Sequence, residues 1–129
     1  MIKKNERVKA MSRILIVDDS STVRRYYREV LENAGHRVEE AVNGYEALEK
    51  VYAGRFDILL VDVNMPKMDG YSFLREIRLA RDLEPVPALM ISTEAGVGDM
   101  DRGFKSGCNM YFIKPMEPAD LLAYVEILG

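Results

Sequence analysis

Apolar and polar positions divide the chain into short hydrophobic runs separated by longer amphipathic stretches. Short runs rich in Val, Ile and Leu are typical of strands that are buried on both faces of a parallel sheet. Four such runs and one weaker run are expected to be strands, at residues 13–17, 37–42, 56–61, 88–91 and 109–113. The stretches between them carry apolar residues at helical spacing, so the pattern predicts strands and helices in alternation.

The expected helices differ in how well the sequence marks them. Ser20 or Ser21 can cap the first helix, and Gly35 can end it. Further helices are expected from Asn43, Gly70 and Pro118 onward. The pattern is weakest at 97–106, because four glycines in and around this stretch lower its helix propensity. We expect a short, mobile helix there.

Five strands that alternate with five helices predict an α/β domain, because strands separated by helices pair in parallel through right-handed crossovers. We expect the flavodoxin-like, doubly wound arrangement of a five-stranded parallel sheet with strand order 2-1-3-4-5. Residues 1–12 have no regular apolar period and are expected to form a flexible N-terminal extension. The 129 residues then leave room for one folded domain, at 13–129.

Polar residues follow four of the apolar runs directly. They are Asp18, Asp19, Asp62, Ser92, Thr93 and Lys114. The carboxyl ends of parallel strands meet at one edge of a sheet, and ligands bind at that edge. Strands 1 and 3, which end at the aspartates, flank the point where the strand order reverses. We therefore expect the three carboxylates to lie together.

Three neighbouring carboxylates repel one another unless a cation shares their site. Ligands that are all oxygen favour Mg²⁺, which keeps several waters and often binds a phosphate as well. The Lys114 ammonium and the hydroxyl of Ser92 or Thr93 could contact phosphoryl oxygens, and one carboxylate could act as the nucleophile. The set predicts phosphoryl transfer assisted by Mg²⁺.

Composition excludes several classes of function. Eighteen basic and 21 acidic side chains give a net charge of −3, which argues against nucleic acid as the partner. The single cysteine, Cys108, cannot form an internal disulfide, and no run is long enough to span a bilayer. We expect a cytoplasmic protein that does not bind membranes.

Arg24 and Arg25 are interpreted as part of a solvated helix face.

Four segments resemble the receiver domains of two-component response regulators, and most closely the stand-alone CheY-like chemotaxis type. They are 14–20 (ILIVDDS), 62–70 (DVNMPKMDG), 90–95 (MISTEA) and 111–115 (YFIKP). The resemblance implies that Asp62 accepts a phosphoryl group from a sensor histidine kinase. It also implies that Asp18, Asp19 and Asp62 bind Mg²⁺ together with the backbone carbonyl of Asn64.

The resemblance assigns further residues to the switch. Ser92 matches the hydroxyl that follows the phosphoryl group, Lys114 matches the lysine that pairs with it, and Tyr111 matches the aromatic switch position. Asn64 and Glu94 match the two positions that tune dephosphorylation. Thr93 stands where CheY-like proteins often have Ala, so its side chain is expected to restrict access for water or a phosphatase. The family has a cis peptide where this chain has Lys114–Pro115.

The implied protein is a monomeric signalling switch rather than an enzyme, with phosphotransfer to itself and autodephosphorylation as its only reactions. Its implied partners are a CheA-like histidine kinase, a downstream protein such as the flagellar motor switch, and a phosphatase.

Two alternatives stay open: a receiver in another phosphorelay or regulatory pathway, and a pseudo-receiver that works without phosphorylation. A dehalogenase-like phosphatase is disfavoured, because its motif has a second Asp where this chain has Asn64. A flavodoxin relative is disfavoured because acids after the first strand would repel a cofactor phosphate.

Overall fold

The computed structural model of the protein describes residues 11–80 and 85–129. Residues 1–10 of the expected extension lie outside the described part. Ser12 is buried at the edge of the fold, where its backbone N–H donates to Nδ1 of His36 at 3.1 Å.

Strands and helices alternate without exception through the described residues. The elements are β1 (Arg13–Val17), α1 (Ser21–Asn33), β2 (Arg37–Ala41), α2 (Gly44–Ala53), β3 (Ile58–Val61), α3 (Gly70–Leu79), β4 (Ala88–Ser92), α4 (Val97–Ser106), β5 (Met110–Ile113) and α5 (Pro118–Leu128). All strand pairs are parallel, in the order β2-β1-β3-β4-β5. The predicted flavodoxin-like fold and strand order are confirmed.

β1 has its predicted bounds, and the bounds of the other four strands differ from the predicted ones by one or two residues. β3 begins at Ile58 rather than at 56, because its pairing with β1 starts at Ile14 and Ile58. The ring of Phe56 instead lies under the guanidinium of Arg13, 5.3 Å from the Arg13 Cζ. β5 begins at Met110, one residue late, and the Asn109 side chain accepts a hydrogen bond from the backbone N–H of Ala88.

α4 is a ten-residue helix, as long as α2 and α3, although glycines made its sequence pattern weak. One of these glycines has a packing role that propensity does not reveal. A Cβ on Gly103 would lie only 2.8 Å from the Tyr111 ring, so glycine lets α4 approach β5 closely. Gly107 ends the helix with φ +114°, in the left-handed region. The expected mobility of this helix stays a prediction.

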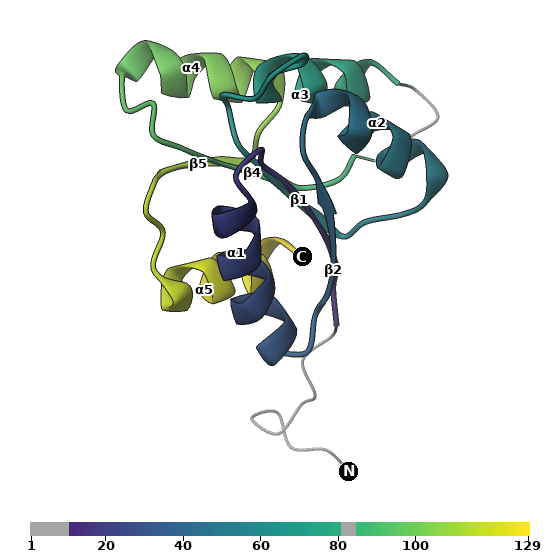
Figure 1. Ribbon diagram of the computed structural model, residues 1–129. Helices are drawn as coiled ribbons and strands as arrows, with labels where there is room; N and C mark the ends of the chain where they lie inside the picture. The colour runs from purple at the N-terminus through teal and green to yellow at the C-terminus, as the bar shows by residue number, and fades with distance from the viewer. Residues whose placement is uncertain (1–10, 81–84) are drawn as a thin grey trace.

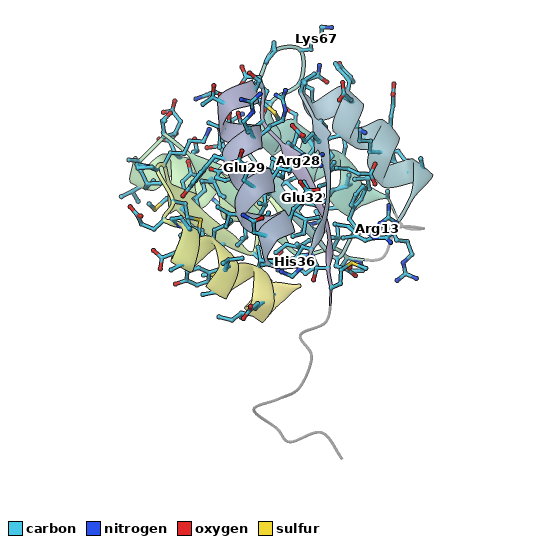
Figure 2. All side chains as sticks on the ribbon, turned by 60° about the horizontal axis from the view of Figure 1, so that its bottom comes forward. Arg13, Arg28, Glu29, Glu32, His36 and Lys67 are labelled. Atoms are coloured by element: carbon cyan, nitrogen blue, oxygen red, sulfur yellow. The ribbon has the colours of Figure 1, made fainter. Side chains whose placement is uncertain are left out.

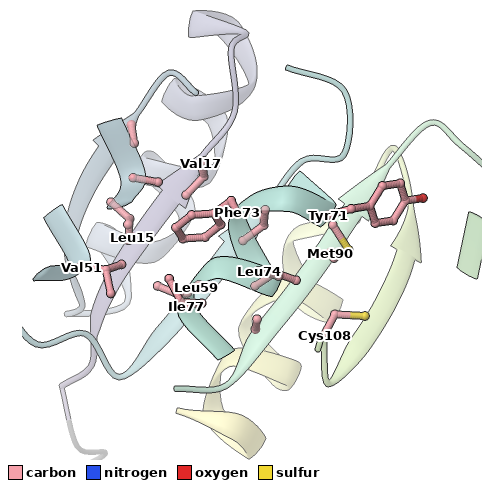
Figure 3. Packing of buried hydrophobic residues seen from close by; sticks show 14 of the residues in the cluster. Leu15, Val17, Val51, Leu59, Tyr71, Phe73, Leu74, Ile77, Met90 and Cys108 are labelled. Carbon is pink, nitrogen blue, oxygen red and sulfur yellow. The ribbon is translucent and has the colours of Figure 1, made fainter. Parts of the chain in front are cut away.

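Helices cover both faces of the sheet, with α1 and α5 on one face and α2, α3 and α4 on the other (Figure 1). Alternate residues of each central strand therefore enter two separate cores. Leu15, Leu59 and Met90 pack with Phe73 and its neighbours on the α3 side (Figure 3). Ile14, Leu60 and Leu89 are among the strand residues that pack toward α1 and α5. None of the helices in the described ranges is long and apolar enough to cross a membrane.

Candidate functional site

Three carboxylates meet where β1 and β3 end. Oxygen atoms of Asp18, Asp19 and Asp62 all lie within 4.8 Å of one another. The backbone N–H of Asp62 donates to the carbonyl of Val17 at 2.8 Å, which continues the β1–β3 pairing into the site. Asp18 and Asp62 are 2% and 7% exposed, while Asp19 is exposed to solvent. The predicted juxtaposition of the acids at the switch point is present.

Lys114 brings a positive charge to the same place from the end of β5. Its ammonium donates to Oδ2 of Asp18 at 2.8 Å and lies 3.4 Å from Oδ1 of Asp62. Its backbone N–H donates to the carbonyl of Ser92, which fixes the end of β5 to the end of β4. The following Lys114–Pro115 peptide is cis. This lysine side chain is 16% exposed and compensates two buried acids.

Without a bound cation, the surroundings of Asp62 disfavour the charged form of its carboxyl group. Burial and the neighbouring Asp18 carboxylate raise the pKa of Asp62 to about 6, and Lys114 offsets only part of this effect. Burial alone would lower the pKa of Lys114, but Asp18 and Asp62 together outweigh it and raise that pKa. A divalent cation with oxygen ligands would relieve the repulsion between the acids, so the donor set fits Mg²⁺.

Removal of Lys114 provides a test of this charge balance. We expect Lys114→Met to lower the free energy of unfolding by about 2 kcal/mol in chelator, because two buried carboxylates lose their cation. The loss should be smaller in saturating Mg²⁺. Urea denaturation in both conditions measures it. Lys105→Met is the matched control, since the exposed Lys105–Asp101 pair should leave the unfolding midpoint unchanged. Equal losses with and without metal would contradict the expectation.

Of the two candidate hydroxyls, Ser92 is buried and Thr93 is exposed. The Ser92 Oγ accepts a hydrogen bond from the backbone N–H of Glu94 at 3.1 Å. Ser92 is also the residue whose carbonyl binds the Lys114 backbone, so it is joined to the charged cluster through the sheet. Ser92 therefore lies at the strand end that is paired with Lys114, and its role as the switch hydroxyl stays a prediction.

Asn64 and Glu94 join the loops that follow β3 and β4. The side-chain amide of Asn64 donates to Oε1 of Glu94 at 2.7 Å, and both groups are accessible to solvent. The backbone carbonyl of Glu94 accepts a hydrogen bond from the Tyr111 hydroxyl, also at 2.7 Å. Tyr111 is therefore held half-buried against the α4 side of the sheet in this structure.

Tyr71 is a neighbour of Tyr111 that the sequence did not single out. Its hydroxyl donates to the carbonyl of Asp99 in α4, and its ring packs 4.4 Å from the guanidinium carbon of Arg102. Burial raises the pKa of Tyr71, and the nearby Tyr111 hydroxyl adds to this. The sequence pattern around Tyr71 gave no indication of these contacts with α4, which are seen only in the packed structure.

The loop from 62 to 70 turns back toward Asp62, the residue predicted to accept the phosphoryl group. Oδ1 of Asp62 accepts the backbone N–H of Val63 at 2.9 Å, and the N–H of Gly70 donates to the carbonyl of Val63. Lys67 stands at the tip of the loop, with a positive φ of 69° (Figure 2). Because the loop reverses the direction of the chain, Gly70, the first residue of α3, lies against the backbone of Asp62.

Comparison with known proteins agrees with this geometry. The family model described as "Response regulator receiver domain" matches residues 14–126. The chemotaxis protein CheY1 of Helicobacter pylori is 36% identical over 118 residues, which are 90% of this chain and 95% of that protein. A CheY homologue of Campylobacter jejuni is 36% identical over 91% of this chain and 92% of its own length.

A solved structure of similar size has the same fold. The chemotaxis protein CheY4 of Vibrio cholerae superimposes with a TM-score of 0.86 at 36% identity, covering 93% of this chain and all of that one. The family match spans most of the chain, and the fold and the order of the strands agree with it. This protein belongs to the response regulator receiver family, whose members are phosphorylation-dependent signalling switches.

Proposed function

We propose that the chain is a stand-alone, CheY-like receiver in which Asp62 is the phosphoacceptor. The observation that supports this most is the set of three carboxylates joined by the Lys114 ammonium. The Asp62 carboxylate lies among the other charged groups of this set, and both Asp18 and Lys114 act on it. Its side chain also keeps a small solvent-accessible surface, which an incoming phosphodonor requires.

Receiver domains bind Mg²⁺ at an acidic pocket, and the aspartate cluster is consistent with such a site. In this proposal Asp18, Asp19 and Asp62 hold the ion together with the backbone carbonyl of Asn64. When bound, Mg²⁺ would neutralise charge on the carboxylates and on the transferred phosphoryl group.

The reaction forms an acyl phosphate. A carboxylate oxygen of Asp62 attacks the phosphorus of a phosphohistidine, the phosphorus–nitrogen bond breaks, and its electron pair remains on the imidazole of the kinase. Lys114 then moves from Asp18 and Asp62 toward a phosphoryl oxygen, where its charge is matched again. Hydrolysis by water returns the free carboxylate and inorganic phosphate, with Asn64 and Glu94 at the entrance to the site tuning its rate.

The switch follows from contacts that phosphorylation would break. In the proposed switch the Ser92 side chain moves toward the phosphoryl group and gives up the hydrogen bond from the backbone N–H of Glu94, so the loop after β4 would shift. That loop also holds the Tyr111 hydroxyl, so Tyr111 would be released to change its position. A partner that prefers the altered surface of α4, β5 and α5 would bind the phosphorylated form about 5- to 150-fold more tightly.

A sensor histidine kinase is the proposed phosphodonor. The names of the bacterial relatives favour a chemotaxis pathway, with a CheA-like kinase and the flagellar motor switch as partners. A receiver in another phosphorelay is the second candidate, because proteins named as a gliding motility regulator and a transcriptional regulator contain similar segments.

The proposal is tested by incubating the protein with acetyl phosphate or phosphoramidate, with Mg²⁺ or with chelator. Intact mass spectrometry should show one added phosphate only when Mg²⁺ is present. Borohydride reduction followed by peptide mapping should place the modification at Asp62. A protein that binds Mg²⁺ but gains no phosphate, even when the reaction is quenched within milliseconds, would favour a pseudo-receiver.

A further inference from the structure

Arg24 is a basic residue near the start of α1 that lies beside the acidic cluster. The sequence pattern predicted a solvated helix face for Arg24 and Arg25, and for Arg24 this is wrong. Its side chain is only 13% exposed, whereas Arg25 is exposed. The guanidinium of Arg24 turns back over the first turn of α1 and donates to two groups outside the helix.

One of these groups is the peptide that joins the two acids at the end of β1. Nη1 of Arg24 donates to the backbone carbonyl of Asp18 at 2.7 Å. This carbonyl belongs to the peptide between Asp18 and Asp19, so its direction sets how the two side chains diverge. Nε of Arg24 donates to Oε1 of Glu40 in β2, also at 2.7 Å. Arg24 therefore ties the acid-bearing turn to the neighbouring strand.

The two acids differ in how much else holds them. The Asp18 carboxylate accepts the backbone N–H of Ser20 at 2.9 Å and the Lys114 ammonium at 2.8 Å. Asp19 is exposed, so the direction of its carboxylate depends mainly on the backbone that carries it. The hydrogen bond from the Arg24 guanidinium to the Asp18 carbonyl is thus the contact that most directly orients the Asp19 carboxylate toward the cluster.

We infer that Arg24 is a positioning residue for Mg²⁺ binding, acting through the peptide between Asp18 and Asp19. The inference rests on the proposed role of these acids as metal ligands. Partners that orient metal ligands from behind typically change metal affinity by about 10- to 100-fold when they are removed. We expect the lower end of this range, because Asp18 keeps its contacts with Ser20 and Lys114.

Arg28 offers a matched control one turn further along α1 (Figure 2). Nε of Arg28 donates to Oε2 of Glu40 at 2.7 Å, so both arginines bind the Glu40 carboxylate through Nε and at the same distance. Arg28 also pairs with Glu32 at 3.2 Å, and only Arg24 reaches the acid turn. Arg24→Met and Arg28→Met each remove one positive charge and one bond to Glu40, while the methionine keeps most of the apolar stem.

Charge and positioning predict opposite results for Arg24→Met. The loss of a positive charge beside the acids would by itself attract a cation more strongly and tighten Mg²⁺ binding. Loss of the bond to the peptide would misplace Asp19 and weaken binding. A weaker affinity in this variant can therefore be attributed to positioning and not to the changed field.

The experiment is a calorimetric titration of metal-free wild type, Arg24→Met and Arg28→Met with MgCl₂, with urea unfolding in chelator as the measure of stability. We expect Mg²⁺ affinity to fall about tenfold in Arg24→Met and less than twofold in Arg28→Met. Affinity in Arg24→Met within twofold of wild type, or tighter, would overturn the inference. Wild type that does not bind Mg²⁺ would instead overturn the proposed function.

Should Arg24→Met fail to fold, Arg24→Lys gives the same comparison. Lysine keeps the charge, but its single ammonium cannot offer the fork that spans the Asp18 carbonyl and Glu40. Weaker Mg²⁺ binding by folded Arg24→Lys supports the positioning role, and unchanged binding contradicts it.

Discussion

Phosphate uptake should fall by at least about a hundredfold in Asp62→Asn, since the amide lacks the nucleophilic oxygen that forms the acyl phosphate. The amide has nearly the shape of the carboxylate and can still accept the backbone N–H of Val63, so the fold should be kept. Timed incubation with a small phosphodonor and Mg²⁺, read by intact mass, measures the loss.

Asp69→Asn is the control for this experiment. Asp69 lies in the same loop and caps α3, with its Oδ1 accepting the N–H of Ser72 at 2.8 Å. Asparagine caps helices about as well as aspartate, so this variant should take up phosphate like wild type. Uptake that persists in Asp62→Asn at the wild-type rate would mean that another residue is the acceptor.

The same Asp62→Asn substitution should stabilise the protein in chelator. Because the pKa of Asp62 is raised to about 6 in the folded state, the folded state retains a proton that the unfolded chain releases near pH 4. Wild type therefore loses stability as pH rises between about 4 and 6, and the full penalty is present above pH 6. We expect the Asn variant to be more stable by about 1–2 kcal/mol at pH 7.5, allowing for solvent screening, with little difference at pH 4. Urea denaturation at both pH values checks this, and a gain that does not depend on pH would contradict it.

Gly70→Ala should produce the largest loss of stability among these substitutions. A Cβ at Gly70 would overlap the backbone carbonyl oxygen of Asp62 and lie 3.0 Å from the end of the Met90 side chain. The carbonyl belongs to the residue that follows β3 and has little freedom to move. Either α3 shifts or the Asp62 peptide rotates, at a cost of about 3 kcal/mol, and phosphate uptake should fall with it.

Gly98→Ala is the matched control for the Gly70 substitution. A methyl group added at Gly98 in α4 would meet no atom of another described element within 4 Å, so alanine there should stabilise the helix by up to about 1 kcal/mol. Thermal unfolding and phosphate uptake of the two variants measure both effects. A Gly70→Ala protein with wild-type stability would show that the β3–α3 loop is more adaptable than its packing indicates.

The order of the elements and the edge of the sheet at which the candidate site lies follow from local features of the sequence. Apolar runs of strand length and helical spacing between them were enough to predict the α/β class, and the flavodoxin-like arrangement expected for it has the observed strand order. Polar residues at the strand ends then predicted that Asp18, Asp19 and Asp62 lie together. These features are readable because periodicity and burial act over a few residues, and parallel α/β topology has few solutions.

Contacts that depend on the direction of individual side chains were decided only by the tertiary structure. The sequence predicted Lys114 at this edge of the sheet, but not that its ammonium binds Asp18, 96 residues away. Arg24 turns from an apparent surface position to the backbone carbonyl of Asp18. Gly103 looked like a weak point of α4 and is a packing requirement against Tyr111. Such contacts leave no periodic trace, because they arise from where packed helices and strands bring side chains that are distant along the chain.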